Sequence, residues 1–352
     1  MIHSHTGRAL FLTGAMIAGS TFLFPGSCMA GTEEVQTYNA TDFAMDTVVT
    51  ETLYTTGDDI TPDLTEILKE KETDLLSWTN KASQIYKANE NSGKDTEISE
   101  ELEGYLSRIL KISEDSDGAL DPTIGKLIRL WDIGGEDQRI PEKTEIRTVL
   151  DEAGWEKITL NGNMLHIDEG CSLDLGAAGK GIGCDAILDH LKDQPEVSAA
   201  LMNLGGSSVM TYGSKPDGSG WNVAVTDPRA ESEDSYLGVV TLNGTEFLST
   251  SGDYEKYFIE DGIRYHHIMD PSTGYPAQSG VTGVTVVCDS GLEADALSTA
   301  CFVLGAEKGA KLLEKYGADG LFVDEDHHVY VTSGMKERFS LLQDAYEVED
   351  IQ

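Results

Sequence analysis

The sequence predicts an α+β fold: one large domain of mixed strands and helices over residues 41–340, after an N-terminal export signal. Three observations support this prediction. The domain contains both segments with helical spacing of apolar residues and segments typical of strands and hairpins. The length of 352 residues is enough for one large domain or two ordinary ones. No internal repeat and no convincing linker divides the chain, which favours one domain.

The first half of this domain is predicted to start with a strand and to continue mainly as helices. Residues 43–54 are typical of a strand. A helix then begins with Thr61 as its cap and Pro62 in its first turn. Periodicity and capping residues predict the remaining elements, which are helices over 99–113, 121–131 and 142–153 and a hairpin over 157–168 with Asn-Gly at its turn.

The second half alternates strands with a few helices. Residues 171–191 (CSLDLGAAGKGIGCDAILDHL) predict a strand, a glycine-rich turn and a helix. Two later helices are predicted over 292–303 and 306–316. Runs of β-branched and aromatic residues predict strands or hairpins over 200–213, 221–228, 237–250, 254–270, 280–288 and 320–332.

Residues 1–30 have the pattern of an export signal. Arg8 precedes the apolar run ALFLTGAMIAGSTFLF, which PGSCMAG follows. Two alternatives stay open: lipidation of Cys28, as in bacterial lipoproteins, although Pro25 stands where that signal usually has Leu, or cleavage after Ala30. Both predict an exported protein at the outer face of the cytoplasmic membrane, with a lipid anchor in the first case. A polar linker over 31–40 and an acidic tail over 341–352 complete the chain.

The composition excludes some classes of partner. The chain has 62 acidic and 25 basic residues, a formal net charge of −37. This charge argues against sequence-independent binding of nucleic acid or of an anionic membrane surface. A compact anionic substrate is still allowed, because a local cation can reverse the field at one site. The cysteines after Cys28 have neither metal-site nor disulfide spacing and are predicted to be buried as small apolar residues.

The glycine-rich turn 174–183 (DLGAAGKGIG) fits neither the Walker pattern nor the Rossmann fingerprint. Gly176, Gly179 and Gly181 have no side chains, so the backbone amides and carbonyls of the turn are accessible there. Lys180 lies next to these glycines in the sequence. Such a turn at a helix start suits an anionic ligand. A plain strand-to-helix turn is the alternative.

The segment YHHIMDPSTGYP (265–276) places His267 and Asp270 close together where a strand ends. A histidine titrates near working pH and can take or give a proton. The alternative is a turn in which Asp270 accepts hydrogen bonds from the backbone of its own turn, while the histidine has its hydrogen-bond partners inside the core. The segment STSGDYEKYF (249–258) is predicted as a hairpin or a binding loop.

Asp295 and Thr299 lie four positions apart in an apolar helical segment, so their Cβ atoms are about 5–6 Å apart on one face. A buried carboxylate is costly unless it is paired or bound to a cation. A carboxylate, a hydroxyl and backbone carbonyls form an all-oxygen set that suits magnesium. A Thr hydroxyl bonded to its own helix backbone is the alternative.

Taken together, these segments resemble the ApbE family, the exported FAD:protein FMN transferases. The resemblance covers roughly residues 43–335. Seven segments carry it in order: FAMDT, GALDPTIGKLIRLW, LDLGAAGKGIGCD, NLGG, STSGDYEKYF, HHIMDPSTGYP and EADALSTA. It implies a T-fold-like domain that binds FAD and Mg²⁺, splits the pyrophosphate, attaches FMN through its phosphate to a Thr hydroxyl and releases AMP.

Site residues follow from the same matching. The resemblance implies that Asp295, Thr299 and the carbonyl of Ala177 hold the magnesium ion, while the role of Ser298 stays open. We name His267 as the general base, oriented by Asp270. The flavin nucleotide is expected to meet Met45, Ala119, Leu120, Asp121, Asp174, Lys180 and Met269.

One departure concerns the aromatic residue that relatives often place two positions after the Ser of an LS pair. Here Thr79 takes that position and Trp78 precedes it, so which ring stacks on the flavin stays open. The implied partners are electron-transfer proteins, exported or membrane-bound, with a Ser/Thr-Gly-Ala-Thr-type sequence. Two other functions stay open: an FAD pyrophosphatase that forms FMN and AMP, and a non-catalytic flavin-binding lipoprotein.

Overall fold

The computed structural model describes residues 34–230 and 235–352. The predicted export signal, including Cys28, lies outside the described residues. In the described ranges no helix is both long enough and apolar enough for a membrane span. The fold is mixed helix and strand, as the sequence predicts.

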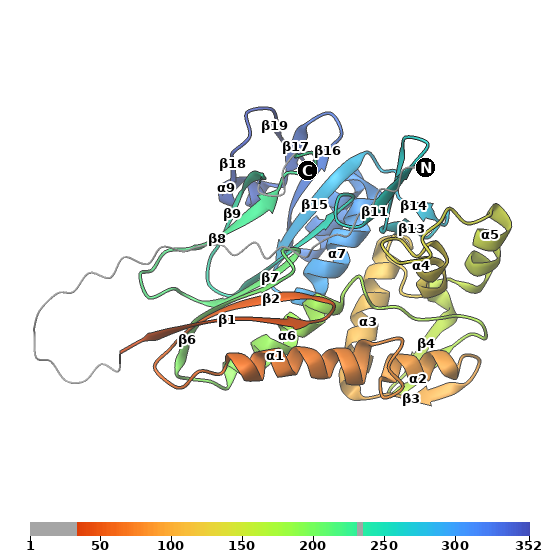
Figure 1. Ribbon diagram of the computed structural model, residues 1–352, viewed down its shortest axis with the longest axis horizontal. Helices are drawn as coiled ribbons and strands as arrows, with labels where there is room; N and C mark the ends of the chain where they lie inside the picture. Colours follow the sequence, from red (N-terminus) through yellow and green to blue (C-terminus); the bar gives the residue numbers. More distant parts are fainter. Residues whose placement is uncertain (1–33, 231–234) are drawn as a thin grey trace, which may run out of the picture. The chain divides into compact units, whose positions relative to one another are not determined.

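A nine-stranded sheet forms the centre of the domain (Figure 1). All neighbouring strands are antiparallel except the last pair, β17 and β19, which are parallel. In spatial order the strands are β1 (Gln36–Ala44), β2 (Thr47–Thr55), β6 (Val197–Leu204), β7 (Ser208–Gly213), β10 (Glu246–Gly252), β15 (Val281–Cys288), β16 (Asp319–Asp324), β17 (His328–Val331) and β19 (Glu347–Asp350).

Helices cover one face of this sheet. The first pair, α1 (Thr61–Glu70) and α6 (Gly179–Lys192), packs on β2, β6 and β7 through a shared apolar cluster. The second pair, α7 (Gly291–Leu304) and α8 (Ala306–Tyr316), packs on β15 and β16. Figure 1 shows α1 and α6 running beside β1, β2 and β6. The apolar residues of α7 are buried all round because α3, α6 and α8 also contact this helix.

The other face of the sheet packs on a three-stranded sheet of β8 (Trp221–Thr226), β9 (Tyr236–Leu242) and β18 (Phe339–Leu341), with α9 (Ser333–Arg338) beside it. Strand residues alternate between the two sides, as the pleat of a strand requires. In β6, Met202 and Leu204 face α1 and α6, whereas Ala199 faces β8 and β9.

The remaining elements belong to neither of these two sheets, and residues from some of them line the cavities described below. The larger helices here are α3 (Glu100–Asp115) and α5 (Lys143–Glu152). The smaller elements are η1 (Lys71–Leu76), α2 (Gln84–Glu90), β3 (Asp95–Glu97), α4 (Gly125–Trp131), η2 (Trp155–Lys157), β4 (Ile158–Asn161), β5 (Met164–Ile167), β11 (Tyr257–Glu260), β12 (Ile263–His266), β13 (Met269–Asp270) and β14 (Tyr275–Pro276).

Three predictions about the ends of elements need correction. Residues 36–40 belong to β1 and are not a linker, because they pair with β2. The strand predicted over 43–54 is interrupted by a turn at Met45 and Asp46, both with positive φ. The acidic tail is ordered in part, since Glu347–Asp350 forms β19 against β17. The predicted helices over 99–113, 142–153, 292–303 and 306–316 are confirmed within a few residues.

Glu51 is a buried acid on β2 that the sequence analysis does not single out. One carboxylate oxygen accepts a hydrogen bond from Thr65 Oγ1 at 2.9 Å, and the other has no partner. Burial raises the pKa of Glu51 to about 7. Because the folded pKa lies above the unfolded value, the folded state binds the extra proton, and stability is lost as the pH rises through about 7.

We therefore expect Glu51→Gln to be more stable than the wild type at pH 8 by about 3 kcal/mol, with little difference at pH 4. Urea unfolding at a series of pH values measures this. Glu97→Gln, an exposed change on β3, is the matched control and should follow the wild type throughout. A pH dependence of stability that is the same in Glu51→Gln and in the wild type would contradict the assignment.

Candidate functional site

Two adjoining cavities open beside the start of α6, with volumes of about 910 and 330 Å³. The larger cavity lies between the β1–β2 turn, the end of η1 and the glycine-rich turn. The smaller one lies between that turn, the segment before α4 and the side of α7. Both cavities are lined by Asp174, Gly176, Lys180, Thr250, Glu255, Lys256 and His267. The shared residues form a neck, the name used below for the place where the two cavities meet.

The cavities bring together all but one of the site residues named from the sequence. Met45 lines the larger cavity. Asp174, Lys180 and His267 lie at the neck. The smaller cavity is lined by Ala119, Leu120, Asp121, Ala177, Met269, Asp295 and Thr299. The exception is Asp270.

The glycine-rich turn is held by local hydrogen bonds. Asp174 accepts a hydrogen bond from the Gly176 amide at 2.8 Å, and α6 then starts at Gly179. The predicted strand before this turn is an extended segment with a single bridge, between Ser172 and Ile124. Lys180 donates to the Ser207 hydroxyl. A cation and a helix start therefore face the same neck, an arrangement suited to an anionic group.

Asp121 lines the smaller cavity but uses its carboxylate within the protein. It accepts hydrogen bonds from the Thr123 amide at 2.8 Å and from the Trp155 amide at 3.1 Å. Burial raises the pKa of Asp121. The helix predicted over 121–131 starts later than expected, because α4 begins at Gly125.

Asp295 is buried in α7, with 5% of its surface exposed. One carboxylate oxygen accepts from the Gly181 amide at 2.5 Å. The other accepts from the Ser208 hydroxyl at 2.7 Å and from the Ser249 hydroxyl. In the described part of the chain no cationic side chain forms an ion pair with Asp295. The buried Asp295 carboxylate thus lines the smaller cavity, and its hydrogen-bond donors are one amide and two hydroxyls.

The residues around Asp295 fit a magnesium ion better than a transition metal. Ala177, Ser298 and Thr299 line the same cavity, so all the donors are oxygen atoms. No group of three or more His, Cys, Asp or Glu side chains in the described residues is arranged to hold a metal by itself. Mg²⁺ is typically held by one or two carboxylates with substrate phosphates completing its shell. One carboxylate beside a neck suited to an anion matches that pattern.

Ser298 takes part in a hydroxyl chain. Its hydroxyl donates to the backbone carbonyl of Asp295 at 2.9 Å and lies 2.8 Å from the Ser251 hydroxyl. Ser251 also lies 3.3 Å from the Thr299 hydroxyl. The Thr299 hydroxyl therefore contacts the Ser251 hydroxyl, and Thr299 lines the smaller cavity.

His267 lies at the neck, half-buried. Its Nδ1 is 3.3 Å from the backbone carbonyl of Lys256, and its amide donates to that same carbonyl at 3.1 Å. Burial lowers the pKa of His267 to about 4, so the imidazole is neutral at physiological pH. If Nδ1 carries the hydrogen that this carbonyl accepts, Nε2 is left as a proton acceptor.

The prediction that Asp270 orients His267 is wrong. Asp270 accepts hydrogen bonds from the amide and hydroxyl of Ser272, at 2.8 and 2.7 Å, and from the Thr273 hydroxyl at 3.1 Å. It lines neither cavity, and no hydrogen bond joins it to His267 among the described residues. In the sequence Asp-Pro-Ser-Thr-Gly the carboxylate accepts hydrogen bonds from residues of the turn that follows it, so its oxygens are not directed at His267. The contact that orients the imidazole is the Lys256 carbonyl.

Two charged residues at the neck were missed, Glu255 and Lys256. Glu255 is exposed at the opening of the cavities, and desolvation by the nearby protein raises its pKa. Both lie in the segment STSGDYEKYF, which was predicted from the sequence as a hairpin or a binding loop without naming these positions. The loop is anchored by Asp253, which forms a two-point ion pair with Arg229 at 2.7 Å.

Trp78 and Thr79 both line the larger cavity. Trp78 has 42% of its surface exposed, and the Arg129 guanidinium lies 4.7 Å from its ring centre. The cation supports the ring from one side. Trp78 therefore presents an aromatic face in this cavity.

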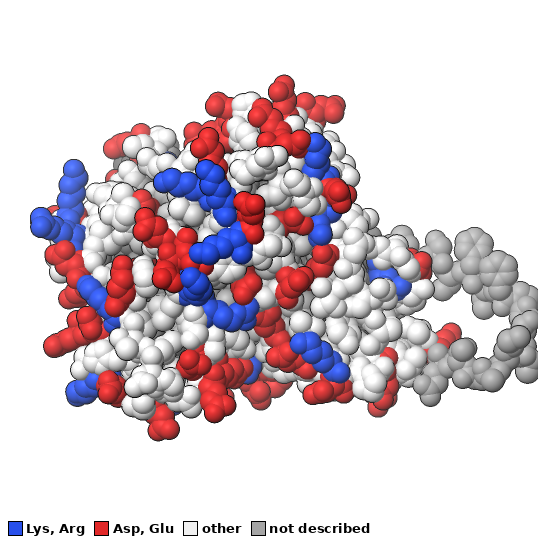
Figure 2. Space-filling model, turned by 180° about the vertical axis from the view of Figure 1, so that it is seen from behind, with Lys and Arg blue, Asp and Glu red and all other residues white. Residues whose placement is uncertain are grey.

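Acidic residues outnumber basic ones in the chain, 62 against 25. Figure 2 shows one face of the molecule, where Lys and Arg side chains lie among a larger number of Asp and Glu side chains. Acidic side chains are thus spread over this face with basic side chains among them. At the neck, Lys180 and Lys256 both line the two cavities.

Comparison with known proteins gives a consistent result. The profile of the ApbE family matches residues 45–322. A Klebsiella pneumoniae FAD:protein FMN transferase is 33% identical over 303 residues, which cover 85% of this chain and 92% of that protein. A Treponema pallidum FAD:protein FMN transferase is 31% identical over 345 residues, which cover 92% of this chain and 94% of that protein.

Two crystal structures are similar over most of their length. The ApbE protein of Thermotoga maritima superimposes with a TM-score of 0.79 at 32% identity, covering 86% of this chain and 99% of the other. The flavinyl transferase ApbE of Pseudomonas stutzeri, in its apo form, gives 0.77 at 29% identity, covering 89% of this chain and all of the other.

Proposed function

Because the chain belongs to the ApbE family of FAD:protein FMN transferases, we propose that it binds FAD across the two cavities and transfers FMN to a Thr hydroxyl of an acceptor protein. In this reaction the Thr oxygen forms a bond to the FMN phosphorus as the pyrophosphate bond breaks. AMP leaves with the bridging oxygen, and the Thr proton passes to a base.

The shape of the site supports this proposal most directly. FAD consists of two ring-bearing halves joined by a diphosphate, and the site consists of two cavities joined by a neck. Lys180 and the start of α6 lie at that neck, where they would meet the diphosphate. The rest of each cavity offers apolar or aromatic surface, including Trp78 in the larger and Met269 in the smaller.

A magnesium ion would be held by Asp295, Thr299 and the Ala177 carbonyl. When bound, it supplies Lewis-acid stabilisation of the charge that develops on the phosphate oxygens. Lys180 adds a second positive charge at the neck. Its bond to Ser207 holds the ammonium group there.

His267 would accept the proton of the acceptor hydroxyl. A Thr hydroxyl is a poor nucleophile at neutral pH, so transfer needs a base or strict positioning. The neutral imidazole has Nε2 available once Nδ1 bonds to the Lys256 carbonyl. Its low pKa keeps the base unprotonated over the physiological range.

We expect His267→Ala to slow FMN transfer by about 10²–10³-fold while FAD stays bound. The pH profile adds a test. The wild-type rate should be constant from about pH 8 to about pH 5 and should fall as the pH falls through about 4, since protonation removes the base. This fall should be absent in His267→Ala. Transfer rates and FAD affinity, both measured across this range, check the expectation.

The control is His267→Gln, which keeps a polar side chain of similar reach. It should bind FAD like the wild type and still lose the rate. If His267→Ala releases FAD and shows no separate effect on rate, the residue is structural and the proposal for the base fails.

The acceptor, magnesium and AMP parts of the proposal are tested together. The protein is incubated with FAD, MgCl₂ and an acceptor domain that carries a Ser/Thr-Gly-Ala-Thr-type sequence, and intact masses are measured. An acceptor heavier by one FMN, with AMP released and no product in EDTA, is the expected result. The same acceptor with Val in place of the final Thr is the control and should stay unmodified.

Two other results would contradict transfer. Free FMN without a modified acceptor would indicate an FAD pyrophosphatase. Bound FAD without any product would indicate a flavin carrier.

We also propose that the protein is exported and works at the outer face of the cytoplasmic membrane on electron-transfer acceptors. The support is the sequence pattern of residues 1–30. Replacing Cys28 by Ser and measuring the mass and membrane association of the mature chain separates a lipid anchor from simple secretion.

A further inference from the structure

Helices α6 and α7 cross at two copies of the same short pattern, a glycine followed four residues later by an aspartate. The copies are Gly181 to Asp185 in α6 and Gly291 to Asp295 in α7. At the crossing the glycine backbones touch: a Cβ on Gly181 would lie 2.0 Å from the Gly291 carbonyl oxygen, and one on Gly291 would lie 2.3 Å from the Gly181 carbonyl oxygen.

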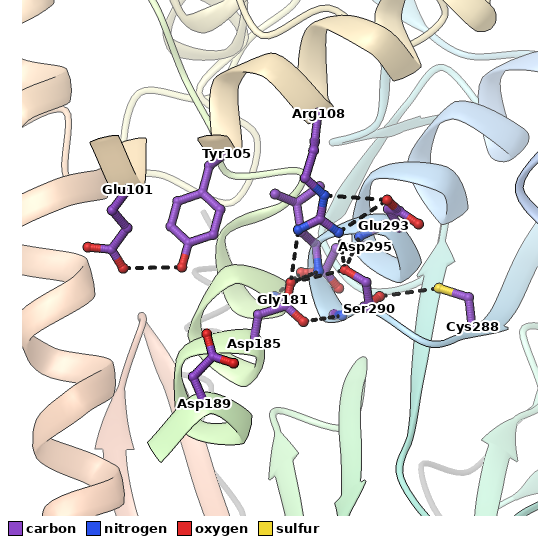
Figure 3. Close-up of polar contacts among 12 residues, drawn as sticks. Glu101, Tyr105, Arg108, Gly181, Asp185, Asp189, Cys288, Ser290, Glu293 and Asp295 are labelled. Atoms are coloured by element: carbon purple, nitrogen blue, oxygen red, sulfur yellow. Dashed lines mark hydrogen bonds and ion pairs between the residues drawn. The ribbon is translucent and has the colours of Figure 1, made fainter. Parts of the chain in front are cut away.

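Each aspartate accepts a hydrogen bond from the glycine amide of the other helix. Asp295 accepts from Gly181 at 2.5 Å, and Asp185 accepts from Gly291 at 2.7 Å (Figure 3). Amides in the first turn of a helix lack partners within their own helix. The two helices therefore cap each other, which fixes their position along one another.

The two aspartates differ in what faces the rest of the carboxylate. The second oxygen of Asp185 accepts hydrogen bonds from the Ser290 hydroxyl at 3.0 Å and the Leu292 amide at 3.1 Å. It also lies 3.6 Å from the guanidinium of Arg108 in α3. The same guanidinium pairs with Glu293 at 3.1 Å and bonds to the Ser290 hydroxyl. Asp295 faces the smaller cavity and hydroxyl groups. Figure 3 shows Arg108 reaching from α3 to Glu293 and Ser290 at the start of α7.

The proposed magnesium ligands come from both sides of this crossing. Ala177 belongs to the turn that leads into α6, while Asp295 and Thr299 belong to α7. A shift of one helix along the other would change the distance between the carbonyl and the carboxylate. Residues that orient ligands in this way commonly affect metal affinity about 10–100-fold.

We propose that Asp185, which forms an ion pair with Arg108, is a positioning residue for cation binding at Asp295. This inference rests on the magnesium site of the proposed function. Asp185 touches neither cavity and acts through the helix crossing. A purely structural role would lower stability without a selective effect on magnesium.

The test is the Mg²⁺ dissociation constant, measured calorimetrically by titrating MgCl₂ into the mature full-length chain saturated with FAD, beside the melting temperature. Asp185→Asn and Arg108→Met are expected to raise this constant about tenfold or more. Arg108→Lys, which keeps the charge, should recover part of the loss. If Asp185→Asn does not fold, Arg108→Met carries the test, since it leaves the Asp185 carboxylate on the Gly291 amide.

Arg338→Met is the matched control. Arg338 also pairs with two carboxylates, Glu246 at 2.7 Å and Asp319 at 3.4 Å, and lines neither cavity. Its loss should lower the melting temperature and leave the Mg²⁺ constant within about twofold. An unchanged constant in Asp185→Asn or Arg108→Met, or an equal rise in Arg338→Met, overturns the inference.

Failure of the magnesium site itself looks different. In that case the wild type with FAD binds no Mg²⁺ at all, and the positioning role of Asp185 is rejected with it. A wild type that binds Mg²⁺ beside an Asp185→Asn variant with the same constant rejects only the positioning role.

Discussion

Asp295→Asn is expected to reduce FMN transfer by about 10³-fold, which corresponds to about 4 kcal/mol of transition-state stabilisation. The amide has the shape of the carboxylate and can still accept from the Gly181 amide, so the helix crossing is kept. What it loses is the negative charge that a divalent cation requires. Single-turnover transfer to an acceptor domain, measured against MgCl₂ concentration, gives the result.

Asp270→Asn is the control for this change. Asp270 was also named from the sequence as a site residue, but it caps its own turn and lines neither cavity. Its substitution should leave the dependence on MgCl₂ unchanged. Full transfer activity in a folded Asp295→Asn variant would remove the metal assignment.

Gly181→Ala is expected to destabilise the protein by about 3 kcal/mol or to prevent folding. The added Cβ would lie 2.0 Å from the Gly291 carbonyl oxygen and 2.8 Å from the Leu292 amide nitrogen. Both are backbone atoms in the first turn of α7, so they cannot move aside by a side-chain rotation. Relief requires α6 and α7 to separate, which breaks the bond from the Gly181 amide to Asp295. Urea and thermal unfolding measure the loss.

Gly104→Ala provides the comparison. Gly104 lies inside α3, and a Cβ there would meet nothing within 4 Å. The same chemical change should therefore be neutral or stabilise the protein by about 0.5–1 kcal/mol, as helix propensity predicts. Equal stability of the Gly181→Ala and Gly104→Ala variants would mean that the two helices do not approach as closely as the structure has them.

The sequence by itself determined the longer helices, and most of the site residues named in advance from it line the two cavities. Periodic apolar residues and capping residues are local signals, so α3 is found within two residues of its predicted bounds, with Ser99 as its cap. The seven ordered segments also identified the family, and eleven of the twelve named site residues line the two cavities. Residue chemistry alone pointed to Lys180, His267, Asp295 and Thr299, whereas the flavin contacts and the Ala177 carbonyl followed from the resemblance to the family.

The tertiary structure decided which groups touch, because those contacts join positions far apart in the chain. Spacing placed Asp270 beside His267, yet the turn satisfies Asp270 and the imidazole faces the Lys256 carbonyl. The bond from Gly181 to Asp295 spans 114 positions, and no local pattern encodes it. Gly181 and Gly291 are required by the close approach of the two helix backbones, which the sequence does not show. The same packing brings the Gly291 amide to Asp185.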